Sequence, residues 1–302
     1  MNLLHLRIET KAVGGVRQPL RRHERRFYRR KRYIGPMKIP GWLGGGNNVA
    51  EAIEAYDLGL AAKYRGDWRE SLAQNQRADK LRPGDEATLW NLGIAATALG
   101  DWEEARRAWR AYGIEVNDGP GAVVAASGRA CVRLNPSGSA EVVWGDRIDP
   151  ARIRILNVPL PSSHRRYGDV LINDGAPEGT RTSNGEEYPV FDELGMWKPS
   201  AYSTFEVELT MPGSMAMERL EEKCRENDMW VEDWGTMRSL CAACSRGNPG
   251  EHDCTSVPTG KNRFGFAAKS EERLRALLKE WKEEEEGIEV GNVTTALNAM
   301  SQ

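Results

Sequence analysis

An internal repeat in the first half of the chain constrains the fold more than any other feature. The phrases Leu58-Gly59 and Gly66-Asp67-Trp68 recur as Leu92-Gly93 and Gly100-Asp101-Trp102, each residue 34 positions later. A period of this length is typical of a helical hairpin that stacks on its next copy. The glycine suits a tight turn between helices, and the aspartate can cap the helix that follows. The repeat therefore predicts four helices, at 49–64, 68–80, 86–98 and 102–115.

The stretch from Glu51 to about Val116 resembles two tandem tetratricopeptide (TPR) repeats. Ala62 lies opposite Ala96 in the two copies, and Pro83 stands where such a repeat usually breaks its second helix. The resemblance implies binding of a protein or peptide in a concave groove, lined by the first helix of each hairpin. The partner-binding positions that it implies here are Tyr56, Leu60, Trp90, Asn91 and Ile94.

This expected groove is apolar and aromatic. TPR repeats that clamp a C-terminal carboxylate need Lys and Asn at set positions, and of these only Asn91 matches. We therefore expect a hydrophobic ligand, such as a helix, a partner domain or the rest of this chain. The alternative is that Tyr56 and Trp90 only pack against the neighbouring domain. Two repeats are too few to bury a continuous core, and the short joint at 117–121 favours a C-terminal domain as the cover.

The first 47 residues are expected to be a disordered basic tail followed by a Gly-rich linker. Residues 17–32 are dense in Lys and Arg, with aromatic residues among them, as in arms that bind nucleic acid. A solvated tail is the simpler interpretation, so a nucleic-acid partner is not expected. Met37 is an alternative start of translation. The run Gly44-Gly45-Gly46 lacks the Gly-Lys-Ser/Thr of a phosphate loop.

The pattern changes to short β-rich runs in a second predicted domain, residues 122–200. The runs at 130–134, 141–144, 152–156 and 169–172 are bounded by turn signals such as Asn135-Pro136-Ser137-Gly138 and Asn173-Asp174-Gly175. They predict a small β-rich module, in the form of a partial barrel. Its polar residues are interpreted as solvated strand ends; they are Asp146, Asp149, Arg165, Arg166 and Asp169.

The third predicted domain, residues 201–292, shows two strand–helix–strand units in tandem. Strands are expected at 203–211, 229–234, 263–268 and 287–290, with amphipathic helices at 214–227 and 270–285. This order is the plan of a ferredoxin-like α/β sandwich. Residues 293–302 are expected to be a tail. The predicted fold class is thus multidomain α+β, with TPR helical hairpins, a β-rich module and a ferredoxin-like sandwich.

A Cys/His loop at 238–260 is the one candidate metal site. Cys241 and Cys244 form a Cys-x-x-Cys pair, and His252 and Cys254 can complete a tetrahedral set for one structural zinc. Reduced thiols without metal fit the same residues. A redox Cys-x-x-Cys is a weaker alternative, because the strand, motif and long helix of thioredoxin are missing. Four protein ligands would leave no open position for catalysis.

Composition and missing motifs favour an interaction protein over an enzyme. The formal net charge is −2 and the chain has five cysteines, an odd number that suits a reducing compartment. No segment is long and apolar enough to be a membrane helix, so we expect a cytoplasmic protein without a membrane partner. The sequence contains no His-Glu-x-x-His, Gly-x-Ser-x-Gly or dinucleotide fingerprint. The predicted catalytic set is therefore empty.

The expected function is non-enzymatic binding of one specific protein or peptide partner. The apolar TPR groove and the C-terminal body would hold it, as in a bacterial immunity or chaperone-like protein that acts on a toxin or effector. The alternative is a nucleic-acid-associated regulator that uses the basic arm and the Cys/His zinc loop.

Overall fold

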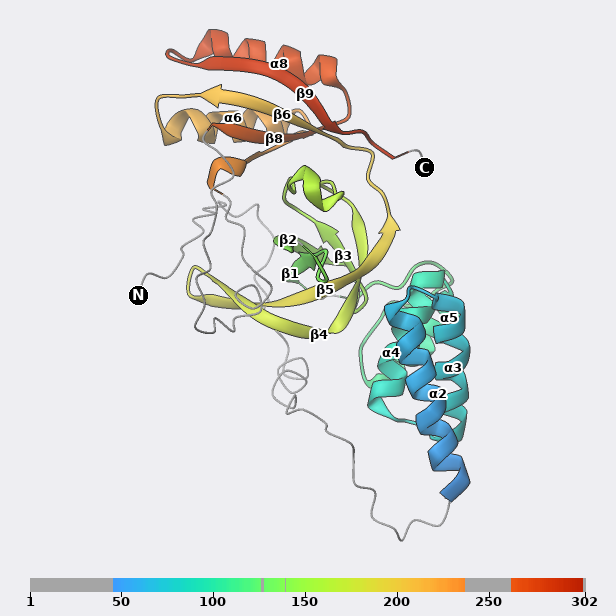
Figure 1. Ribbon diagram of the computed structural model, residues 1–302. Helices are drawn as coiled ribbons and strands as arrows, with labels where there is room; N and C mark the ends of the chain where they lie inside the picture. The colour runs from blue at the N-terminus through green and yellow to red at the C-terminus, as the bar shows by residue number, and fades with distance from the viewer. Residues whose placement is uncertain (1–45, 126–127, 139, 237–261, 301–302) are drawn as a thin grey trace, which may run out of the picture.

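The computed structural model describes residues 46–125, 128–138, 140–236 and 262–300. These residues form a mixed α+β structure in which N-terminal helices are followed by two β-sheets. Figure 1 shows three layers along the molecule, with the helices at one end, a barrel in the middle and a second sheet with its helices at the other end. Among the described residues, no helix is both long and apolar enough to cross a membrane.

The N-terminal layer consists of four helices close to the predicted bounds. They are α2 (Gly46–Tyr64), α3 (Trp68–Leu81), α4 (Glu86–Leu99) and α5 (Trp102–Tyr112). The predicted caps are confirmed, since the side chains of Asp67 and Asp101 accept hydrogen bonds from the third backbone N–H of the following helices. The last helix ends earlier than predicted, because Gly113 takes a left-handed conformation and closes it.

Two repeated glycines let these helices approach one another closely. A Cβ atom at Gly93 would lie 2.6 Å from the ring of Trp109, and one at Gly59 would lie 2.6 Å from the side chain of Asn75. The two helices of each hairpin therefore meet at a glycine, as the small residues in the repeat predict. Trp109 fills the space at the second hairpin and is fully buried.

The middle layer is a closed barrel of five strands in the order β1-β2-β3-β4-β5, where β1 and β5 pair in parallel and the other neighbours are antiparallel. Leucine, isoleucine, valine and phenylalanine side chains fill its core. The turn at Asn135 joins β1 to β2 as predicted, with a hydrogen bond from Gly138 N–H to the Asn135 carbonyl. The strands are β1 (Arg129–Leu134), β2 (Glu141–Arg147), β3 (Arg152–Ile155), β4 (Val170–Ser183) and β5 (Glu186–Lys198).

The third layer is a four-stranded antiparallel sheet in the order β7-β8-β6-β9. Two helices pack against one face of it and bury a core that includes Leu220, Phe266 and Trp281. Ser270 caps the second helix, where its side chain accepts a hydrogen bond from the backbone N–H of Arg273. The elements are β6 (Ser203–Thr210), α6 (Ser214–Glu226), β7 (Trp230–Asp233), β8 (Arg263–Ala268), α8 (Glu271–Glu284) and β9 (Glu289–Leu297).

Two expectations about the β-strands differ from the structure. The barrel is closed rather than partial, because β4 runs on to Ser183 and pairs with β5, a strand that the sequence patterns did not indicate. The tail expected from residue 293 begins later, because β9 continues to Leu297 along β6. Only Val293 is buried among its last five residues, and the exposed Thr294 and Thr295 follow it, so the sequence carries a weak strand signal there. The tail and linker expected at 1–47 lie outside the described residues except for the start of α2.

Candidate partner-binding site

The second half of the expected groove is covered by the barrel. Trp90 lies on α4, and its indole rests directly on Gly175 of β4, where a Cβ atom would come within 1.4 Å of Trp90 Nε1. Asn91 and Ile94 on the same helix are buried. The described contacts of these three residues are thus with other parts of the same chain. The rest of the chain was one of the ligands expected for the groove.

A buried ion pair links the two repeats to the same barrel strand. Lys63 at the end of α2 is 3% exposed. Its ammonium group donates to Asn91 Oδ1 and to Asp174 Oδ1, both at 3.1 Å. The Tyr64 hydroxyl donates to the other Asp174 oxygen at 3.1 Å. Asn91 is therefore engaged within the chain, which agrees with the argument against a carboxylate clamp at this position.

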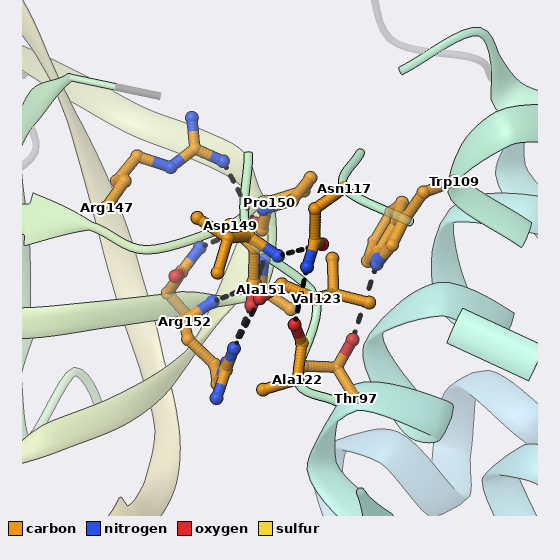
Figure 2. Close-up of polar contacts among 12 residues, drawn as sticks. Thr97, Trp109, Asn117, Ala122, Val123, Arg147, Asp149, Pro150, Ala151 and Arg152 are labelled. Atoms are coloured by element: carbon orange, nitrogen blue, oxygen red, sulfur yellow. Dashed lines mark hydrogen bonds and ion pairs between the residues drawn. The ribbon is translucent and has the colours of Figure 1, made fainter. Parts of the chain in front are cut away.

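A second polar contact joins the barrel to the segment between α5 and β1 (Figure 2). Asp149 and Arg152 form an ion pair with 2.6 Å between Oδ2 and Nε, and both side chains are buried. The guanidinium group lies over the rings of Trp102 on α5 and Trp197 on β5, at 4.8 and 4.4 Å from their centroids. It also donates to the Val123 carbonyl at 2.7 Å. One buried cation thus fixes three segments of the chain.

Two further polar residues of the barrel also differ from the interpretation as solvated strand ends. Asp169 is buried and accepts hydrogen bonds from the backbone N–H groups of Arg166 and Ser200. Arg166 is also buried, and its Nε donates to the Asn298 carbonyl beyond β9. Buried polar groups need hydrogen-bond partners. Asp169 finds them in two backbone segments of the chain, and Arg166 finds one at the contact with the third layer. Asp146 is exposed, as the interpretation expects.

The first half of the expected groove, on α2, remains open. Ile53, Tyr56, Leu60 and Tyr64 recur at intervals of three and four residues, so they lie along one face of the helix. Ile53 is 42% exposed and Tyr64 is 63% exposed, while Tyr56 and Leu60 are half-buried. We call these four residues the α2 stripe. Tyr56 and Leu60 are the two residues of the stripe that the sequence predicted for the groove; of the other three, Trp90 is also half-buried and Asn91 and Ile94 are buried.

The electrostatic surroundings of the α2 stripe are acidic. Burial raises the pKa of the Tyr56 hydroxyl, and the charges of Asp85, Asp57 and Asp174 raise it further. Glu54 and Asp57 are exposed on the same helix. The charge of Lys63 is balanced by Asp174. A ligand that covers this surface would therefore gain from positive charge at its rim.

A different seam, between the barrel and the third layer, holds two carboxyl groups that the sequence patterns did not single out. Both oxygens of Glu141 accept the backbone N–H of Leu160, at 3.1 and 3.3 Å. Glu232 on β7 accepts from the Asn157 amide at 2.9 Å. Desolvation raises the pKa of Glu141 to about 8 and that of Glu232 to about 7, and each also feels nearby acids. Glu232 thus bonds across the seam, whereas Glu141 holds the Leu160 segment beside it.

These raised pKa values predict that stability falls as pH rises. In the folded chain the two carboxyl groups keep their protons above the pH at which they ionise in the unfolded chain. Their contribution is therefore complete below about pH 4.5 and declines up to about pH 8. Urea midpoints at pH 5, 6, 7 and 8 should fall for the natural chain, and fall less for Glu141→Gln with Glu232→Gln. Glu187→Gln, at an exposed position, should follow the natural chain. If the urea midpoint changed with pH by the same amount in all three proteins, this prediction would be contradicted.

The predicted zinc ligands Cys241, Cys244, His252 and Cys254 lie outside the described residues. Within the described part, no group of three or more His, Cys, Asp or Glu side chains is placed to hold a metal ion. Cys131 and Cys224 are buried free thiols, and burial raises the pKa of each to about 12, which keeps them unreactive. Cys224 lies in the core of the third layer, as its position on the apolar stripe predicts.

Comparisons with known proteins give little to add to this geometry. No family model matches the chain, and no curated protein matches it. A solved structure described as "Novel crystal structure of a hypothetical protein from Neisseria gonorrhoeae" is 13% identical, with a TM-score of 0.27. The match covers 58% of this chain and 96% of that chain. A similarity this low supports no conclusion about fold or function.

Proposed function

We propose that this chain is a non-enzymatic protein that binds one specific partner through the α2 stripe. The four helices are proposed to be two TPR repeats; the 34-residue recurrence and the matched glycine contacts support this. The third layer is proposed to be a ferredoxin-like sandwich, supported by its β7-β8-β6-β9 order and its two helices on one face. Neither fold alone specifies an activity.

The observation that carries the proposal is the difference between the two repeats. In the second repeat Asn91 and Ile94 are buried, and the half-buried Trp90 packs on β4. In the first repeat the half-buried Tyr56 and Leu60 continue into two exposed side chains, Ile53 and Tyr64. Exposed apolar side chains along one helix face form a surface that a partner can bury. The barrel thus leaves one repeat's groove face available to a partner.

The chemistry of the surface defines the partner that fits. A helix can lie against an apolar stripe with residues at i, i+3, i+4 and i+7. The acidic residues around the stripe favour Lys or Arg beside those apolar positions. We therefore propose an amphipathic, basic helix of another cytoplasmic protein. An immunity or chaperone-like role toward a toxin or effector is the specific form that we propose.

Two substitutions on the same helix test the proposal. Ile53→Glu adds a charge to the α2 stripe, and Leu58→Glu adds the same charge on another face of α2, at a residue that is 45% exposed. We expect a stoichiometric partner to co-purify with the natural chain and with Leu58→Glu. Ile53→Glu should lose it, with at least a tenfold rise in Kd once the partner is purified. Retention by Ile53→Glu, or loss in both variants, would contradict a binding site on the stripe.

One structural zinc in the Cys/His loop remains part of the proposal. It rests on the sequence spacing of the four ligands alone. Elemental analysis of the purified protein, with Cys241→Ser beside it, tests whether zinc is bound. The role proposed for the zinc is structural. The partner is proposed to contact the α2 stripe and not the metal.

A further inference from the structure

A groove on the third layer lies far along the chain from the α2 stripe and has a different chemistry. It has a volume of about 200 Å³ and runs between α8 and β9. Apolar Leu278, Val290 and Val293 contribute to its lining, together with Gly291. Three basic residues from one side of α8 complete it; they are Arg275, Lys279 and Lys282. The groove is thus apolar between cationic side chains.

One wall of the groove is the edge of the sheet. Among the strands that the structure describes, β9 is last in the order β7-β8-β6-β9 and pairs with β6 on one side only. Natural sheets usually protect such an edge with Lys, Pro or other charges. Glu289 is the only charged residue among the nine of β9, and the strand contains no proline. Most of its residues are exposed. β9 shifts register against β6 in two places, so pairing with another strand is confined to the stretches of this edge outside the shifts.

The three basic side chains differ in what they do. Arg275 is held in place, because its guanidinium group contacts Glu271 at 2.7 Å and donates to the Val293 carbonyl at 2.9 Å. Lys279 is 78% exposed and lies 3.9 Å from Glu283, which is a loose contact. Lys282 is exposed and has no ion pair with the residues that the structure describes. Two ammonium groups are thus available to a ligand.

We propose that this groove binds an acidic, extended peptide segment of a partner protein, which adds to the sheet as a strand beside β9. Main-chain hydrogen bonds to the edge would supply affinity, and alternate side chains would supply specificity. Side chains on one face of a strand recur about every 7 Å, close to the separation of residues three apart on a helix. Two carboxylates at alternate positions of the segment can therefore reach the two lysines, with one aliphatic side chain at the next position on the same face. The carboxylates pair with Lys279 and Lys282. The aliphatic side chain lies against Leu278 and Val293.

A labelled peptide, Thr-Glu-Thr-Glu-Thr-Ile-Thr with blocked ends, tests this proposal on the full chain by fluorescence anisotropy. We expect saturable binding that weakens as salt rises. Replacing both glutamates of the peptide by lysine should abolish it. Methylating the amide nitrogens of alternate residues, on the edge that would pair with β9, should weaken binding at least tenfold, because those N–H groups would bond to the strand.

Charge reversal in the protein supplies the matched control. Lys279→Glu with Lys282→Glu should weaken binding at least tenfold. Arg225→Glu with Arg273→Glu changes the net charge equally at exposed helical positions outside the groove lining, and should leave binding within twofold. Three results would overturn the proposal. The N-methylated peptide could bind as tightly as the unmodified one, both double variants could weaken binding equally, or the peptide could show no saturable binding to the natural chain. The site is separate from the α2 stripe, so either can fail without the other.

Discussion

Gly175→Ala is expected to destabilise the chain by at least about 3 kcal/mol, a large effect for a single methyl group. The added Cβ would lie 1.4 Å from Trp90 Nε1 and 2.1 Å from the next ring atom. Trp90 cannot move aside easily, because its ring also packs edge-on against Trp109 and Tyr112, with centroids at 5.1 and 4.9 Å. The helices and the barrel would have to separate locally. Urea denaturation of the purified variant measures the loss.

A double-mutant cycle assigns that loss to the contact itself. Trp90→Ala alone removes a large packed ring, at a cost of about 3–5 kcal/mol. In that background Gly175→Ala should lower the free energy of unfolding by less than about 1 kcal/mol, because the ring atoms that the added Cβ would overlap are absent. Gly121→Ala serves as the control, since a Cβ there meets nothing within 4 Å. A Gly175→Ala variant as stable as the Gly121→Ala variant would contradict the packing of Trp90 on β4.

The helical layer was largely predictable from the sequence because its signals are local. The recurrence of Gly66-Asp67 as Gly100-Asp101 placed two turns and two caps, and each cap depends on atoms only three residues apart. The strands were less predictable. Gly175 follows Asn-Asp and has the composition of a turn, yet it lies inside β4, where its missing side chain makes room for Trp90. A local pattern cannot distinguish a glycine used for a turn from one used for close packing.

The candidate site was predictable only in part, for the same reason. The repeat indicated which side chains of α2 and α4 share a groove face, and the sequence also raised the possibility that the rest of the chain covers it. Which half is covered depends on Lys63 meeting Asp174 and on Trp90 meeting Gly175, and both contacts join distant segments. The carboxyl groups of Glu141 and Glu232 are another such case. Their pKa values follow from burial at a seam between layers, which no spacing in the sequence indicates.

The second large effect is expected at the ion pair of Asp149 and Arg152, which Figure 2 shows. Asp149→Ala should destabilise the chain by about 3–5 kcal/mol, because it leaves the charge of Arg152 buried without a counterion. It also removes the acceptor of two backbone N–H groups, those of Ala151 and Arg152, each at 2.8 Å from Oδ1. Salt should change this loss little, since the pair is shielded from solvent. Urea midpoints at low and high salt measure both effects.

Three further variants separate the charge from the hydrogen bonds. Asp149→Asn keeps an oxygen for the two backbone N–H groups but not the charge, so its loss should be smaller than that of Asp149→Ala. Asp149→Ala combined with Arg152→Met removes the stranded cation and should recover part of the stability. Glu51→Ala breaks an ion pair with Arg77 in which both side chains are 49% exposed, and should cost less than about 1 kcal/mol. If Asp149→Ala cost no more than Glu51→Ala, Arg152 would not be the buried cation that connects the helices, the linker and the barrel. A double variant less stable than Asp149→Ala alone would instead show that the guanidinium group stabilises the seam mainly through Trp102, Trp197 and the Val123 carbonyl.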